Sequence, residues 1–62
     1  MKMWISRDYT NRIALYDKEP IEVYGVFATP LGGTECYLPM NWFPELTFEN
    51  SPQQVEIKLI EE

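Results

Sequence analysis

The sequence predicts a small, mainly β domain: an antiparallel meander of four to six short strands with at most one helical turn. Three observations support this prediction. Hydrophobic and polar residues alternate along most of the chain, which is the period of a half-buried strand. The alternating segments are rich in Val, Ile, Tyr, Phe and Trp, and clusters of Pro, Gly, Asp and Asn separate them. The pattern fits either an open sheet or one that closes towards a small barrel.

The N-terminal half predicts a hairpin followed by a third strand. Residues 2–7 and 12–16 both alternate, and the polar segment 8–11 between them carries the Asp and Asn side chains that favour turns. The next β-rich run is residues 22–28, in which Gly25 marks a bulge or a point of close approach. We therefore expect one continuous strand there.

The C-terminal half predicts shorter elements. Residues 34–38 form a candidate strand, and the prolines at both ends of 39–44 leave room only for a turn or a single 3₁₀ turn. Residues 46–49 predict a short extended piece, and 53–60 predict a half-buried strand with Val55, Ile57 and Leu59 on one face. A one-turn helix over 52–54 is the competing interpretation of the Ser-Pro pair before that strand.

The length sets the limit on complexity. A chain of 62 residues buries on the order of 60% of its surface on folding, which suffices for one domain over residues 1–62 and for no deep cleft. Cys36 is the only cysteine and there is no histidine, so neither an internal disulfide nor a Cys/His zinc site is available. Stability must come from aromatic packing or from a partner chain.

The residues predict a protein that is not an enzyme and that holds no metal or cofactor. No histidine is present to activate a nucleophile, and Cys36 in a short strand is best interpreted as a small apolar side chain. Gly32-Gly33 lacks the Lys-Ser/Thr that follows a phosphate-binding loop. Asp17, Glu19 and Glu22 lack the spacing of calcium ligands and read as a solvated turn.

The charge argues against direct nucleic-acid binding. Five Lys and Arg stand against ten Asp and Glu, which leaves a formal net charge of -5 and no basic footprint for phosphate. The sign of the charge fits an alternative, an acidic inhibitor that occupies the nucleic-acid-binding groove of a host protein. That alternative requires the carboxylates to gather on one face.

Large side chains on both faces of the first three strands predict an interaction surface. The alternation assigns one set to the core and the opposite set to a second face. The predicted core is Met3, Ile5, Ile13, Leu15, Val23 and Phe27, and the second face carries Trp4, Tyr16, Tyr24 and Val26. Either the Trp42-Phe43 turn and the C-terminal strand cover one face, or an exposed aromatic patch binds a protein or a second copy of the chain. The predicted anchors of that patch are Trp4, Tyr16, Tyr24 and Trp42.

Four segments of the chain carry a resemblance to a known class of proteins. They are Trp4-Ile5-Ser6-Arg7-Asp8, Lys18-Glu19-Pro20, the stretch Phe43-Pro44-Glu45-Leu46-Thr47-Phe48-Glu49-Asn50-Ser51-Pro52, and the terminal Val/Glu alternation. Together they resemble short uncharacterised proteins of bacterial genomes and their phages or other mobile elements. The resemblance implies an intracellular protein of a bacterium or its phage, acting on a host component, and it assigns no site residues.

The remaining signals agree with a cytoplasmic location. The N-terminal residues lack the apolar run of a signal peptide, no segment approaches the roughly 18 apolar residues of a membrane span, and a lone cysteine fits a reducing compartment. We therefore predict a non-catalytic accessory or regulatory protein that works by binding another protein.

Overall fold

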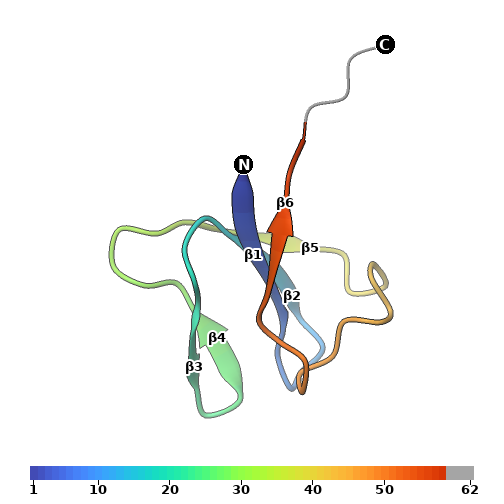
Figure 1. Cartoon of the computed structure of the whole chain (residues 1–62). Helices are drawn as coiled ribbons and strands as arrows, with labels where there is room; N and C mark the ends of the chain where they lie inside the picture. The colour runs from blue at the N-terminus through green and yellow to red at the C-terminus, as the bar shows by residue number, and fades with distance from the viewer. Residues whose placement is uncertain (59–62) are drawn as a thin grey trace.

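The structure, a computed structural model, describes residues 1–58 and consists of short strands in two antiparallel sheets (Figure 1). The strands are β1 (Lys2–Arg7), β2 (Ile13–Tyr16), β3 (Ile21–Val23), β4 (Val26–Ala28), β5 (Glu35–Leu38) and β6 (Gln53–Glu56). The predicted fold class, a small mainly β domain with antiparallel strands, is confirmed.

The larger sheet has four strands in the order β5-β2-β1-β6. β1 and β6, the first and last of the described strands, lie side by side, since Met3 pairs with Val55. On the other side of β1, Trp4 pairs with Tyr16 and Ile5 with Leu15, as in the predicted hairpin. The sheet ends at β5 and at β6, so over residues 1–58 it stays open and does not form a barrel.

Asp8 explains why the chain turns between β1 and β2. Its Oδ1 accepts hydrogen bonds from the Thr10 N–H at 2.9 Å, the Thr10 hydroxyl at 2.6 Å and the Arg12 N–H at 3.0 Å. Asn11 takes a left-handed conformation with φ 73°, which Asn tolerates better than most residues. The local sequence therefore encodes this turn through its Asp and Asn, as predicted.

The expectation of one strand over residues 22–28 is wrong, because this segment is the β3–β4 hairpin. Tyr24 and Gly25 between the strands both have positive φ, 50° and 85°. Positive φ at both central residues is the signature of the two-residue hairpin turn. Tyr9 anchors the hairpin to the rest of the chain, since its N–H donates to the Gly25 carbonyl at 3.0 Å.

Two other expectations fail in the C-terminal half. Residues 46–49 lie in turns rather than in an extended piece, because the Asn50 side chain accepts from the Thr47 N–H at 2.8 Å and closes the loop. Residues 52–54 form no helical turn, since Gln53 already starts β6. The predicted strand over 53–60 is confirmed only as far as Glu56, and Leu59 and Ile60 lie outside the described residues.

Each face of the main sheet has its own cover. On the first face, the loop 39–46 places Leu46 over the core, which is Ile5, Ile13 and Leu46, flanked by Leu15, Leu38 and Val55. The second face carries Ser6, Ala14 and Tyr16, all buried.

The β3–β4 hairpin contacts the second face at Tyr16. The Tyr16 hydroxyl donates to the Phe27 carbonyl at 3.4 Å and accepts from the Ser6 hydroxyl at 3.2 Å. The Phe27 ring lies against Phe48, with centroids 6.0 Å apart. Val23, expected in the core, is 43% exposed, because the hairpin forms a separate small sheet instead of extending the large one.

Candidate protein-interaction groove

An apolar groove of about 400 Å³ opens on the first face of the main sheet. Strands β1, β2, β5 and β6 form its floor, and the loop 39–46 forms one wall. Its lining residues are Ile5, Leu15, Leu38, Trp42, Phe43, Glu45, Leu46, Gln53, Val55, Glu56 and Ile57. The loop covers the buried core but leaves this hollow beside it.

Exposed hydrophobic side chains lie along the rim of the groove. Trp42 is 49% exposed, Phe43 44% and Ile57 45%. The two rings of the loop pack edge to face, at 6.1 Å between centroids and 86° between planes. Aromatic side chains in this half-exposed state are typical of protein interfaces.

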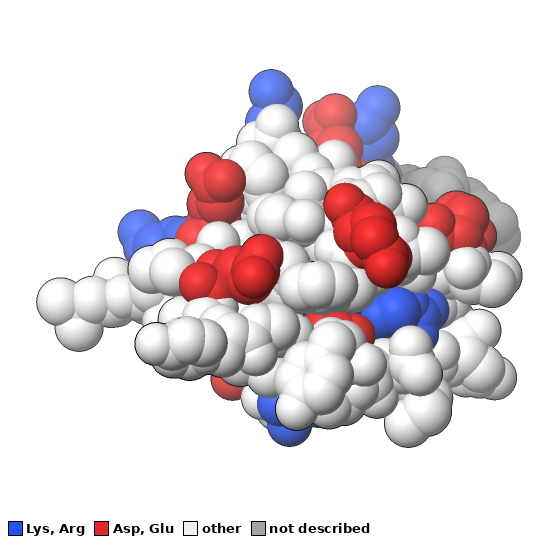
Figure 2. All heavy atoms as spheres, turned by 90° about the horizontal axis from the view of Figure 1, so that it is seen from below, with Lys and Arg blue, Asp and Glu red and all other residues white. Residues whose placement is uncertain are grey.

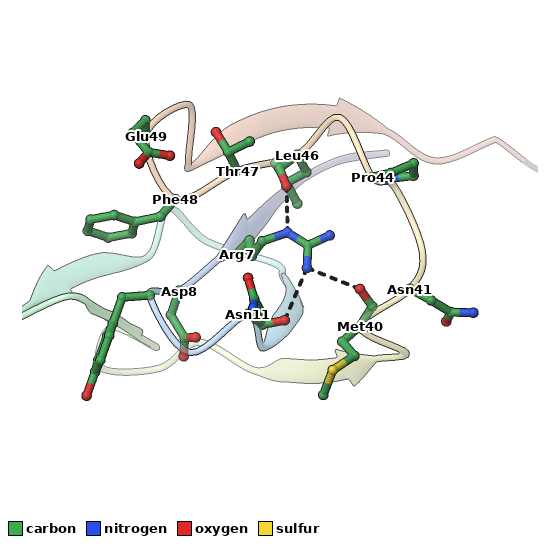
Figure 3. A pocket seen from close by; sticks show the side chains of 11 residues that line it. Arg7, Asp8, Asn11, Met40, Asn41, Pro44, Leu46, Thr47, Phe48 and Glu49 are labelled. Carbon is green, nitrogen blue, oxygen red and sulfur yellow. Dashed lines mark hydrogen bonds between the residues drawn. The ribbon is translucent and has the colours of Figure 1, made fainter.

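Arg7 holds the loop that carries these rings. It lies on the same face of β1 as Ile5 and is 9% exposed. All hydrogen bonds of its guanidinium go to backbone carbonyls, and Figure 3 shows three of them. The acceptors are the carbonyl oxygens of Leu46, Asn11, Met40, Trp42 and Phe43.

The hydrogen bonds of Arg7 make the loop a fixed platform. Four of the five carbonyls belong to residues 40–46, and a guanidinium has five donors in a rigid fork. Turns within the loop add to this, since the Leu46 N–H donates to the Phe43 carbonyl at 2.9 Å. Phe43 itself has a φ of 54°, a conformation that the surrounding hydrogen bonds must maintain.

The larger hollow around Arg7, about 640 Å³, has a mixed polar and apolar lining, and Arg7 is the one Lys or Arg among its lining residues (Figure 3). The donors of Arg7 are used by carbonyls, so it has none left for an anionic ligand. Asp8 accepts the turn hydrogen bonds and lies 3.5 Å from the Arg12 guanidinium. Arg7 and Asp8 in this hollow therefore hold the loop and the turn.

Two pKa shifts reflect the local structure. Burial raises the pKa of the Tyr16 hydroxyl, which sits beneath the hairpin. For Asp8, burial works in the same direction, but the hydrogen bonds from Thr10 and Arg12 and the charge of Arg12 outweigh it and lower its pKa. Both shifts belong to groups that hold the fold.

The structure separates the four predicted anchors. Trp42 lies in the groove, whereas Trp4 is half-buried on the opposite face of the sheet. Tyr16 is 2% exposed, so it is a core residue and cannot act as a surface anchor, because the β3–β4 hairpin covers it. Tyr24 is 97% exposed at the tip of that hairpin, remote in the fold from the groove.

Sequence reasoning missed Phe43 and Ile57 as surface residues of the groove. The alternation of Val55 and Ile57 placed both on one strand face, but it did not indicate that the loop 39–46 would leave that face partly open. The position of the loop depends on the hydrogen bonds of Arg7 and on the packing of Leu46, which join segments far apart in the sequence.

Charged side chains are mixed on the face that Figure 2 shows. Its acidic side chains are separated by neutral surface, and Lys and Arg lie among them. This face lacks the continuous acidic band that an occupant of a nucleic-acid-binding groove requires.

Comparison with protein-family models, curated proteins and solved structures finds no match to this chain. Within residues 1–58 there is no helix long and apolar enough to cross a membrane. The same residues contain no cluster of three or more Cys, Asp and Glu side chains placed to bind a metal ion.

Proposed function

We propose that this protein is a non-catalytic accessory or regulatory domain that binds another protein through the groove beside the loop 39–46. The observation that carries the proposal is the combination of an apolar hollow with half-exposed Trp42 and Phe43 on its rim. Large exposed apolar patches are uncommon on monomers and mark interaction sites. The resemblance to short bacterial and phage proteins supports a bacterial protein as the partner.

Preorganisation supports this role. A binding loop that is ordered before contact loses little conformational entropy when it binds. The Arg7 guanidinium fixes the carbonyls of Met40, Trp42, Phe43 and Leu46, so the two rings project from an ordered backbone. An apolar side chain of the partner then enters a cavity whose shape already exists.

Charge at the rim defines the chemistry of the partner. Glu45 lines the groove, and none of its lining residues is Lys or Arg. Complementary charge favours the encounter of unlike surfaces. The occupant is therefore a segment with apolar side chains flanked by Lys or Arg. A second copy of this chain is a poorer fit, since two such rims would place carboxylates against carboxylates.

The test is a selection of displayed random peptides on the immobilised protein. We expect the enriched sequences to combine a large apolar side chain with flanking Lys or Arg. A synthetic peptide of the enriched sequence should perturb the amide resonances of Leu38, Val55 and Ile57, which line the groove.

Two aromatic substitutions provide the matched pair. Trp42→Ala should weaken the peptide at least about tenfold, the loss typical of an interface anchor. Tyr24→Ala, which removes an exposed ring outside the groove, should leave the affinity unchanged. Enrichment of acidic peptides, equal binding by Trp42→Ala, or no enrichment at all would overturn the proposal.

A further inference from the structure

The outer edge of β5 lies apart from the groove and has exposed residues. β5 is the terminal strand of the main sheet, and its residues Glu35, Cys36 and Tyr37 are exposed. The strand has four residues, carries one charged side chain, Glu35, and contains no proline, lysine or bulge. Such an edge accepts another strand through its free backbone groups.

The hydrogen bonds of the sheet show which backbone groups face outwards. The Asp17 N–H donates to the Thr34 carbonyl, so the backbone groups of Thr34 face β2. Along a strand these groups alternate in direction. Those of Cys36 therefore face β2 as well, and the N–H and C=O of Glu35 and Tyr37 point away from the sheet.

A second copy of β5 fits this edge in one antiparallel register. If Cys36 lies opposite Cys36 of the second copy, Glu35 of each copy lies opposite Tyr37 of the other. Each of these two pairs exchanges two backbone hydrogen bonds, and every outward-facing group of Glu35 and Tyr37 is then satisfied. Pro39 has no N–H to extend the ladder, which limits it to this short length.

Charge complementarity favours a second copy as the occupant. The Arg12 guanidinium lies 4.9 Å from the centroid of the Tyr37 ring on the same chain. In the symmetric register, Glu35 of the second copy faces Tyr37 and so approaches Arg12. The same contact forms twice, once on each side of the symmetry axis.

We propose that two copies of this chain associate through β5, in a symmetric antiparallel pairing centred on Cys36, to form one continuous eight-stranded sheet. This surface is separate from the groove, and the proposal does not depend on the peptide-binding role. The short ladder predicts a weak dimer that dissociates on dilution.

Sedimentation equilibrium over a range of protein concentrations tests the pairing, with Cys36→Ser as the background to exclude disulfides. We expect a reversible monomer–dimer equilibrium. Tyr37→Pro removes an outward N–H together with the exposed ring that Arg12 contacts, and it should weaken the dimer about tenfold or more. Gln54→Pro is the matched control on β6, the opposite edge of the sheet. The Ile57 N–H donates to the Met1 carbonyl and therefore faces β1, and the alternation along β6 leaves the Gln54 N–H facing outwards.

Glu35→Lys tests the register independently of proline, since it places Lys against Arg12 of the other copy and should also weaken the dimer. The dispersion of amide resonances establishes that each variant folds. In the chain with native Cys36, diamide should take up two hydrogens from the paired thiols and trap the dimer as a disulfide. The disulfide dimer should form more slowly in the Tyr37→Pro variant that keeps Cys36. A monomer at every concentration, or a dimer weakened by Gln54→Pro and not by Tyr37→Pro or Glu35→Lys, would overturn the proposal.

Discussion

The guanidinium of Arg7 donates its Nε–H to the carbonyl of Leu46, a residue that lies 39 positions further along the chain. Leu46 also belongs to the buried hydrophobic cluster with Ile5 and Ile13. This hydrogen bond therefore joins the first strand to the loop that closes the core. Within residues 1–58 this buried cation has carbonyl acceptors and no carboxylate partner, so it acts here as a structural group.

Arg7→Lys should destabilise the fold strongly. The ammonium has no planar fork, so it cannot satisfy carbonyls that Arg7 reaches in several directions. We expect a loss of about 2–4 kcal/mol in the free energy of unfolding, measured with urea. Arg12→Lys on the exposed side of the turn should change it by no more than about 0.5 kcal/mol. Equal stability of the two variants would contradict the role of Arg7.

Tyr16→Phe should lower the free energy of unfolding, because Tyr16 is a core residue and not a surface anchor. The substitution removes the hydroxyl that bonds Ser6 and the Phe27 carbonyl, and it leaves the buried Ser6 hydroxyl without its acceptor. We expect a loss of about 1–2 kcal/mol in thermal or urea unfolding. Tyr24→Phe is the control, because that hydroxyl has no hydrogen bond within the described residues and the ring is 97% exposed. A neutral Tyr16→Phe would mean that the hairpin does not rest on this hydroxyl.

Stability should fall in acid through Asp8. Its pKa lies below the ordinary value of 3.8 in the folded state, so the folded state favours the carboxylate. The resulting stabilisation is present above pH 3.8 and is lost as the pH falls through the lower, folded-state pKa. Urea unfolding at several pH values should show this loss, and Asp8→Asn should reduce the slope in that window. An unchanged slope would assign the acid sensitivity to other carboxylates.

Two glycines with nearly equal φ provide a matched test of the hairpin contact. A Cβ at Gly25 would lie 2.9 Å from Tyr9 Cδ1, whereas a Cβ at Gly32 would meet nothing within 4 Å. Both alanine substitutions carry the strain of a positive φ, about 1 kcal/mol. Gly25→Ala should cost more, because the Tyr9 ring must also move. Equal losses in unfolding free energy would show that the ring moves aside without cost.

Local sequence patterns predicted the main sheet well. The β1–β2 hairpin, β5 and the start of β6 follow from alternation and from the Asp and Asn of the first turn. These features depend on residues that are close in the chain, and their physical cause is local. The β3–β4 hairpin was missed because Tyr24 takes a positive φ that nothing in its residue type indicates.

The candidate site was predicted only in part for a related reason. Trp42, in the turn segment 39–44, lies in the groove, whereas Tyr16, in the alternating segment 12–16, is buried. The sequence predicted both as exposed aromatic anchors. Which sheet face becomes covered depends on where the hairpin and the loop 39–46 pack. The role of Arg7 was equally invisible, since its carbonyl acceptors come together only in the folded chain.

The sequence by itself determined a small acidic β domain without histidine and with one cysteine, whose core must come from aromatic and aliphatic packing. Periodicity and turn residues are enough for that, because they act over a few neighbouring positions. Only the tertiary structure decided which aromatic residues are core and which are surface. Arg7 fixes the loop over one face and Tyr16 receives the hairpin on the other, so contacts between distant segments leave the groove beside Trp42 open.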